Sequence, residues 1–187
     1  MSLIKVNELL QHATEHHYGV PAINVINTET IRYAIQAAED EHMPIIIQYW
    51  PGFEDHCALD IIAFAARYYA ERASVPVAVH QDHSAGYEIA VKGVKAGFPS
   101  VMVDGSSLPY EENFQLTKDV VQVAKIFDVD IEAELGHVGN GSDANDFVNS
   151  DHYTDPNLAE EFVEGTGCGS LAIAVGNAHG ETVRETA

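Results

Sequence analysis

Short apolar runs rich in β-branched residues alternate with longer segments of helical period through most of the chain. Runs such as Ile45–Ile47 and Val101–Val103 are apolar at consecutive positions, which is typical of strands covered on both faces. The pattern predicts an α/β fold with parallel strands. The expected strands are Pro21–Ile26, Pro44–Trp50, Val75–Asp82, Ser100–Gly105, Asp130–Gly136 and Ser170–Gly176. The expected helices are Val6–His17, Thr28–His42, Leu59–Ala73, Ala85–Ala96, Glu111–Phe127 and Pro156–Gly165.

Several helix ends carry recognisable signals. Asn27 or Thr28 can cap the helix that follows the first strand, and Ser84 can cap the helix after the third. Gly97 follows an apolar-periodic segment and predicts a helix end. Each strand is therefore expected to be followed by its own helix.

Six such strand–helix units after an opening helix fit either an open doubly wound sheet or part of a (β/α)8 TIM barrel. An open sheet usually has a glycine-rich loop after its first strand, and Val25–Glu29 contains no glycine. In a barrel, polar groups gather at the carboxyl ends of many strands. Such groups are Asn24, Gln48, Asp82, His83, Asp104, Glu134 and His179. The sequence therefore favours a single domain over residues 1–187, an incomplete barrel with about six of its units.

Composition narrows the function classes. Nine basic residues stand against 29 acidic ones, and the formal net charge of −20 disfavours nucleic acid and anionic membrane surfaces as partners. No apolar run approaches membrane-spanning length. Cys57 and Cys168 lie far apart in sequence, so neither a disulfide framework nor a thiolate zinc site is expected. A cytoplasmic protein fits these features best.

Two glutamates share one face of a predicted strand. Glu132 and Glu134 alternate with Ile131, Ala133 and Leu135, so both carboxylates point the same way. If that face is the barrel interior, at least one carboxylate requires a cation or a proton. The alternative is a strand end with two solvated glutamates. The preceding segment Val129–Ile131 favours the buried strand.

Asp82 and His83 close one apolar strand, and His179 follows another. An imidazole in this position can bind Zn²⁺ and leave the neighbouring carboxylate as an acid or base. Taken singly, a helix-capping aspartate with an exposed histidine is the commoner arrangement, and His179 alone is more often a surface residue. The coincidence of three such strand ends favours a metal site.

Several ordered motifs resemble one enzyme family. They are Val20–Asn24, His80–His83, Ser100–Ser106, Glu132–Gly136 and Ala174–Gly180. Over the stretch from the first helix to Gly180, the chain resembles the class II, zinc-dependent ketose-bisphosphate aldolases, nearest to the tagatose- and fructose-bisphosphate members. The resemblance implies a (β/α)8 barrel and reversible cleavage of a ketose 1,6-bisphosphate to dihydroxyacetone phosphate and glyceraldehyde 3-phosphate.

The resemblance also implies roles for single residues. His83 and His179 would be zinc ligands, and Asp82 the acid/base at the C4 hydroxyl. Asp104 and Glu134 correspond to a second cation position with Glu132 beside them. Gly180 would contact the triose phosphate and Asn24 would line the site. The implied partners are a small sugar phosphate and further copies of the chain.

The sequence departs from the family at four places. No His-Gly-Gly-Ser-Gly segment with a third zinc histidine follows Gly180, and residues 181–187 read as a polar tail outside the family pattern. Ser142 stands where the family has a loop glutamate, with Asp143 adjacent, in a candidate lid over Gly139–Asp146. Asn140 replaces a small residue, and Trp50 replaces a serine or threonine. Two further hypotheses therefore stay open: an inactive remnant with a partial metal site, and a barrel lyase for another sugar phosphate.

Overall fold

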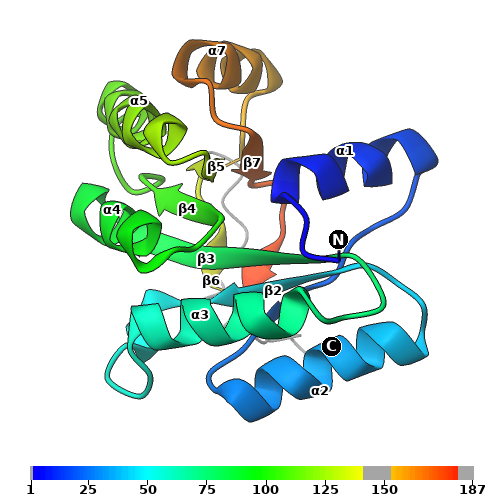
Figure 1. Ribbon diagram of the computed structural model, residues 1–187. Coiled ribbons are helices and arrows are strands. Elements are labelled where there is room, and N and C mark those ends of the chain that lie inside the picture. Colours follow the sequence, from blue (N-terminus) through cyan, green and yellow to red (C-terminus); the bar gives the residue numbers. More distant parts are fainter. Residues whose placement is uncertain (1, 141–152, 181–187) are drawn as a thin grey trace, which may run out of the picture.

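Six parallel strands form one curled sheet in the computed structural model, which describes residues 2–140 and 153–180 (Figure 1). The strand order is β1-β2-β3-β4-β5-β7, so each strand lies beside its neighbour in the chain apart from the short β6. The strands are β1 (Ala22–Asn24), β2 (Ile45–Tyr49), β3 (Val77–Ala85), β4 (Ser100–Asp104), β5 (Asp130–Leu135) and β7 (Ser170–Ile173). All six predicted strands are confirmed, with β1 and β7 shorter than expected and β3 longer.

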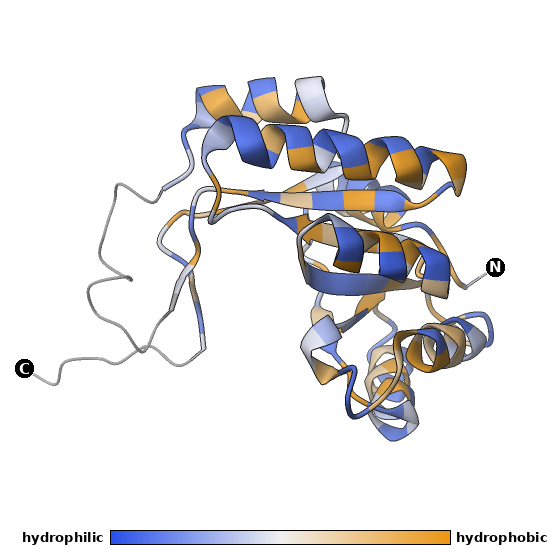
Figure 2. Ribbon diagram, turned by 90° about the vertical axis from the view of Figure 1, so that its left-hand side faces the viewer, coloured by the Kyte–Doolittle hydropathy of each residue, from blue (hydrophilic) through white to orange (hydrophobic). Residues whose placement is uncertain are grey.

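Helices cover both faces of this sheet. They are α1 (Val6–His16), α2 (Thr28–Asp40), α3 (Leu59–Ala70), α4 (Tyr87–Ala96), α5 (Tyr110–Ile126) and α7 (Pro156–Thr166), with a 3-10 turn, η1, at Pro51–Phe53. Helices α2 to α5 and α7 follow one another around the outside of the curl, and α1 lies on its open side (Figure 1). The helices show alternating polar and apolar residues, as amphipathic helices do (Figure 2).

The two faces of the sheet have separate apolar clusters. Ile45, Ile47, Val77 and Val79 belong to the large cluster beneath the outer helices. Ile46 and Ala78 alternate with them and pack against Val6 and Leu9 of α1 on the inner face. Because both faces of β2 and β3 are covered by apolar residues, each strand is apolar at consecutive positions in the sequence.

The helix-end signals are confirmed in two of three places. Asn27 caps α2, its side chain accepting a hydrogen bond from the Thr30 amide at 2.9 Å, and the Thr30 hydroxyl completes a capping box. Gly97 ends α4 in a left-handed conformation, φ 95°. Ser84 was expected to cap α4, and this is wrong: Ser84 belongs to β3, where its hydroxyl accepts a 2.7 Å bond from Gln81, and Gly86 precedes the helix.

A β-bulge interrupts β3 where the expected strand end lies. Gln81 pairs with Val101 and Ser84 pairs with Val103, so three steps on β3 match two on β4. The extra residue lies within Asp82–His83, and His83 adopts a positive φ of 28°. A regular strand would direct adjacent side chains to opposite faces, whereas a bulge changes their direction. With this local irregularity, the adjacent side chains of Asp82 and His83 both face the same cavity.

A second, two-stranded sheet lies beyond β5 and β7. Strand β6 (Gly139–Asn140) pairs in parallel with β8 (Ala178–His179), and Asn140 is opposite His179. Segments of two residues give no periodic signal, so the sequence did not predict this sheet. None of the helices in the described residues combines the length and apolarity needed to cross a bilayer.

Candidate active site

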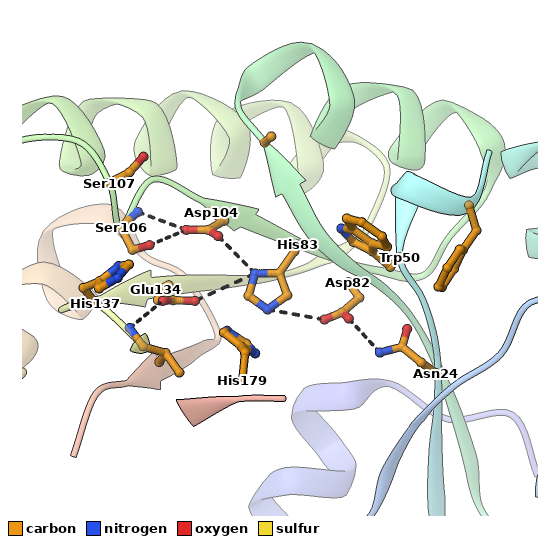
Figure 3. Close-up of a pocket in the computed structure, with 13 residues that line it drawn as sticks. Asn24, Trp50, Asp82, His83, Asp104, Ser106, Ser107, Glu134, His137 and His179 are labelled. Carbon is orange, nitrogen blue, oxygen red and sulfur yellow. Dashed lines mark hydrogen bonds and ion pairs between the residues drawn. The ribbon is translucent and has the colours of Figure 1, made fainter. Parts of the chain in front are cut away.

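A cavity of about 660 Å³ opens at the carboxyl ends of the strands. Six of the predicted site residues line it: Asn24, Asp82, His83, Asp104, Glu134 and His179. They come from five strands, β1, β3, β4, β5 and β8, and their side chains converge on His83 (Figure 3). The convergence is the arrangement expected where parallel strands end at one edge of a curled sheet.

His83 and Asp104 form the central ion pair of the cavity. His83 Nδ1 lies 3.0 Å from Asp104 Oδ2, and each side chain is about a quarter exposed. The hydrogen bond with Asp104 raises the pKa of His83 to about 9, outweighing the opposing effect of burial. Burial raises the pKa of Asp104, but the hydrogen bonds from His83 and Ser106 outweigh it and lower the pKa to about 2. The pair is therefore charged at neutral pH in the metal-free protein.

Glu134 completes a cluster that can hold a cation. One ligand atom each from His83, Asp104 and Glu134 lie within 4.8 Å of one another. The Glu134 side chain is 3% exposed, and burial raises its pKa, with the nearby Asp104 carboxylate adding to the shift. An imidazole and two carboxylates gathered at this spacing fit a divalent metal, which would replace the proton on His83 and relieve the repulsion between the carboxylates.

Asp82 lies beside this cluster and outside it. Its Oδ1 is 3.9 Å from His83 Nε2, while its Oδ2 accepts a 2.9 Å hydrogen bond from the Asn24 side chain. Asn24 sits at the end of β1, paired with Gln48 of β2. This hydrogen bond from Asn24 on β1 orients the Asp82 carboxylate on β3, with β2 lying between the two strands. Asp82 is placed to exchange a proton with a molecule bound at the cluster.

His179 faces His83 from the small sheet. The two imidazole rings lie 5.1 Å apart in an edge-to-face arrangement, at an interplanar angle of 74°. His179 is exposed, and its position depends on the pairing of β8 with β6. Gly180 follows with φ 75° and does not line the cavity. The geometry thus brings the rings of the two predicted histidine ligands close together, although His179 is not part of the His83–Asp104–Glu134 cluster.

A second polar network lies beneath the cavity. His80 is 3% exposed, with Nδ1 2.8 Å from the Ser100 hydroxyl and Nε2 3.4 Å from Glu132. Burial lowers the pKa of His80 to about 4, so its imidazole is neutral at pH 7. Burial also raises the pKa of Glu132 to about 7, and the Asp82 charge adds to this. The expectation that Glu132 and Glu134 share the inner face is confirmed, because Ile131, Ala133 and Leu135 all belong to the outer cluster.

The cavity also contains residues that sequence reasoning missed. They are Phe53, Ala85, Ser106, Ser107, His137 and Val138. Ser106 holds Asp104 through its amide at 3.0 Å and its hydroxyl at 2.7 Å. His137 follows the Glu132–Gly136 motif closely, and that closeness was the available signal. Ser142, Asp143 and the candidate lid beyond residue 140 lie outside the described residues, as does the tail 181–187.

Comparison with known proteins places these features in a family. The class II fructose-bisphosphate aldolase family matches residues 4–187. The uncharacterized protein YdjI of Escherichia coli K12 is 41% identical over 168 residues, which are 90% of this chain and 60% of that protein. This chain therefore spans about three fifths of the length of that relative.

Two solved structures share the architecture. The crystal structure of the YdjI aldolase from Escherichia coli K12 superposes with a TM-score of 0.85 at 37% identity, covering 98% of this chain and 64% of the other. Fructose-bisphosphate aldolase from Campylobacter jejuni superposes with a TM-score of 0.76 at 26% identity, covering 98% and 61%. The six parallel strands are thus part of an aldolase TIM barrel, as the sequence predicted. On the family match and these likenesses, the chain belongs to the class II fructose-bisphosphate aldolase family.

Proposed function

We propose that the protein catalyses the reversible, zinc-dependent aldol cleavage of a ketose phosphate to dihydroxyacetone phosphate and an aldehyde. The observation that carries this proposal is the position of Asp82, 3.9 Å from His83 yet outside the His83–Asp104–Glu134 cluster. Aldol chemistry needs a proton carrier beside the metal that is not consumed as a ligand. The family match supports the reaction class.

His83 and His179, with Glu134 and Asp104 as further oxygen ligands, would hold the zinc ion. When bound, zinc acts as a Lewis acid that draws electrons from the ketose carbonyl. Asn24 keeps the Asp82 carboxylate turned toward the substrate through the 2.9 Å hydrogen bond. In cleavage, Asp82 accepts the proton of the C4 hydroxyl as the C3–C4 bond breaks. C4 becomes the aldehyde carbon, the electron pair stays with C3, and protonation of C3 gives dihydroxyacetone phosphate.

The test combines metal binding with turnover. Zinc binding is measured by calorimetry, and cleavage by a coupled assay for dihydroxyacetone phosphate on ketose 1-phosphates and 1,6-bisphosphates, with and without zinc. Asp82→Asn should lower kcat by at least about a hundredfold, because it removes the proton acceptor while leaving the metal ligands in place. Its zinc affinity should stay within about threefold of that of the unaltered protein.

Asp119→Asn is the matched control, since Asp119 lies on the outer helix α5 and bonds to Gln115. It should change neither zinc binding nor turnover. The proposal is overturned if no ketose phosphate is cleaved at saturating zinc, which would favour the remnant hypothesis. Full activity in Asp82→Asn would instead exclude Asp82 as the proton carrier.

A further inference from the structure

An aromatic wall closes one side of the cavity. The rings of Trp50 and Phe53 meet edge to face, with centroids 5.2 Å apart and planes at 88°. The indole covers Gly52 so closely that a Cβ there would lie 2.4 Å from the ring, so this packing requires glycine. Both rings line the cavity, and Trp50 is still 44% exposed. The wall is therefore an apolar surface that faces the cavity and is available to a ligand.

The wall lies on the same side of the cavity as the proposed proton carrier. Trp50, Asp82 and Asn24 lie to one side of His83, and Glu134 and His137 lie to the other (Figure 3). Asp82 acts at the C4 hydroxyl in the proposed function, so the substrate carbons beyond C4 extend past Asp82. The aldehyde half of the substrate therefore meets Trp50 and Phe53.

On the Trp50 side of His83, the described residues that line the cavity include no lysine or arginine that could meet a phosphate. Eight of the nine basic residues lie in the described part of the chain, and none of them lines the cavity. Several are engaged elsewhere: Lys5 pairs with Asp128 at 2.7 Å, Arg67 bonds to the Gly97 carbonyl, and Arg72 stacks on Tyr68. Charged groups among the described lining include the carboxylates Asp82, Asp104 and Glu134.

A phosphate placed here would exchange its hydration for an indole face and a nearby carboxylate, which is unfavourable without a cation. An uncharged polyol chain behaves differently, because its C–H groups can pack on the aromatic rings while its hydroxyls stay in the open part of the cavity. The wall therefore discriminates between a charged and a neutral aldehyde half.

Resting on the proposed function, we propose that Trp50 and Phe53 are specificity-determining residues that select ketose 1-phosphates whose aldehyde half is uncharged. Cleavage then gives dihydroxyacetone phosphate and a neutral aldose: the C3–C4 bond breaks, the C4 hydroxyl loses its proton and C3 gains one. A 1,6-bisphosphate, which the resemblance to the family implied, is the disfavoured substrate.

Trp50 is the single tryptophan in the sequence, so its fluorescence reports directly on this wall. The probes are D-erythrose and D-erythrose 4-phosphate, which differ in the phosphate alone. We expect D-erythrose to change the emission saturably, with an affinity at least about tenfold higher than that of its phosphate. Equal or tighter binding of the phosphate, or unchanged emission with both probes, would overturn the inference. Because this titration requires no turnover, it decides the inference even if the cleavage assay fails.

Turnover supplies a second test. We expect kcat/KM to favour a ketose 1-phosphate over the corresponding 1,6-bisphosphate by about tenfold or more, with Trp50→Ser reducing this ratio about tenfold and Trp50→Phe retaining most of it. Phe64→Ser is the matched control, because Phe64 is an exposed aromatic residue on α3, 71% exposed and outside the cavity. Circular dichroism verifies that each variant folds. A ratio that favours the bisphosphate, or that Trp50→Ser leaves unchanged, would refute the assignment.

Discussion

His83 is the side chain on which the site depends most directly. One of its nitrogens bonds to Asp104 and the other faces Asp82, so it connects the proposed metal cluster to the proposed proton carrier. Its positive φ is 28°, a conformation that few residues other than glycine adopt. Such strain at a residue facing several charges is typical of functional sites. Because His83 lies between two carboxylates, we expect its ionisation to affect the stability of the metal-free protein.

The His83–Asp104 pair predicts a particular pH dependence. The pKa of His83 rises from 6.5 to about 9, so its contribution to stability is fully present below pH 6.5 and is lost as pH rises through about 9. The pKa of Asp104 falls from 3.8 to about 2, so its contribution is present above pH 3.8 and is lost as pH falls through about 2. The pair therefore stabilises the protein most between pH 3.8 and pH 6.5.

Asp104→Asn should remove this contribution. In urea unfolding with a chelator present, the unaltered protein should be the more stable at about pH 6, and the difference should shrink by about pH 9.5. Glu29→Gln, on the exposed start of α2, serves as the control and should show no such trend. A difference that is the same at both pH values would show that His83 is not coupled to Asp104.

Prediction from sequence succeeded where a residue's position follows from strand direction. Asn24, Asp104 and Glu134 end or nearly end regular strands, so counting along the strand was enough to place them in one cavity. Phe53 and His137 lie on connecting segments, where side-chain direction depends on loop geometry rather than on period. The same limit applies to Trp50, which the sequence marked as a departure from the family, whereas its packing on Gly52 came from the structure.

At the scale of the element, β3 and α4 support the site together. Gln81 is fully buried at the bulge, and its side chain donates to the Ser84 hydroxyl at 2.7 Å and to the Ile89 carbonyl at 3.2 Å. Gly93 of α4 leaves the space for it, because a Cβ at Gly93 would lie 2.1 Å from Gln81 Oε1. The absence of a side chain at Gly93 thus allows α4 to pack closely against the bulged strand β3.

Gly93→Ala should therefore destabilise the protein by about 1–3 kcal/mol, although alanine is the better helix former. The displaced Gln81 would lose its bonds near the bulge, so zinc affinity should fall as well. Gly19→Ala is the matched control, since nothing lies within 4 Å of a Cβ at that position. Urea unfolding and zinc calorimetry measure the two effects. An equally or more stable Gly93→Ala would contradict this account of the helix–strand contact.

The elements themselves were largely predictable, and their irregularities were not. Apolar periodicity located all six strands and the six helices, because burial on both faces leaves a strong signal. The bulge left no such signal, since an extra residue at a strand end resembles the start of a loop. Ser84 was misplaced for this reason, because a serine before a helix is normally a cap and here it stays in the strand.

At the scale of the whole molecule, charge and open sheet edges act against each other. Strand β7 pairs with β5 on one side, and on its other side no strand of the described residues pairs with it. Ile173 on this edge is 44% exposed. An apolar strand edge invites pairing with another chain, whereas a net charge of −20 keeps the chains apart.

This balance predicts self-association as the charge is neutralised. Light scattering should rise as the pH falls from about 8 toward the isoelectric point near 4.6, and Ile173→Lys should reduce the rise by placing a charge on the edge. Phe64→Lys adds the same charge to an exposed aromatic position of α3 and should have a smaller effect. Equal suppression by both variants would mean that net charge rather than the strand edge controls association.

The bulge in β3 has a consequence for how this site can change over generations. Asp82 and His83 both line the cavity because β3 has one extra residue there. The arrangement therefore depends on the length of the strand as well as on the identity of its residues. Exchanging either side chain removes one group, whereas deleting one of the two positions would remove one group and return the other to the alternation of a regular strand. A related protein could therefore lose the proposed proton carrier or the histidine ligand through a single deletion in β3 and keep every other motif. A comparison of relatives that scores residue identity alone would underestimate the effect of such a deletion.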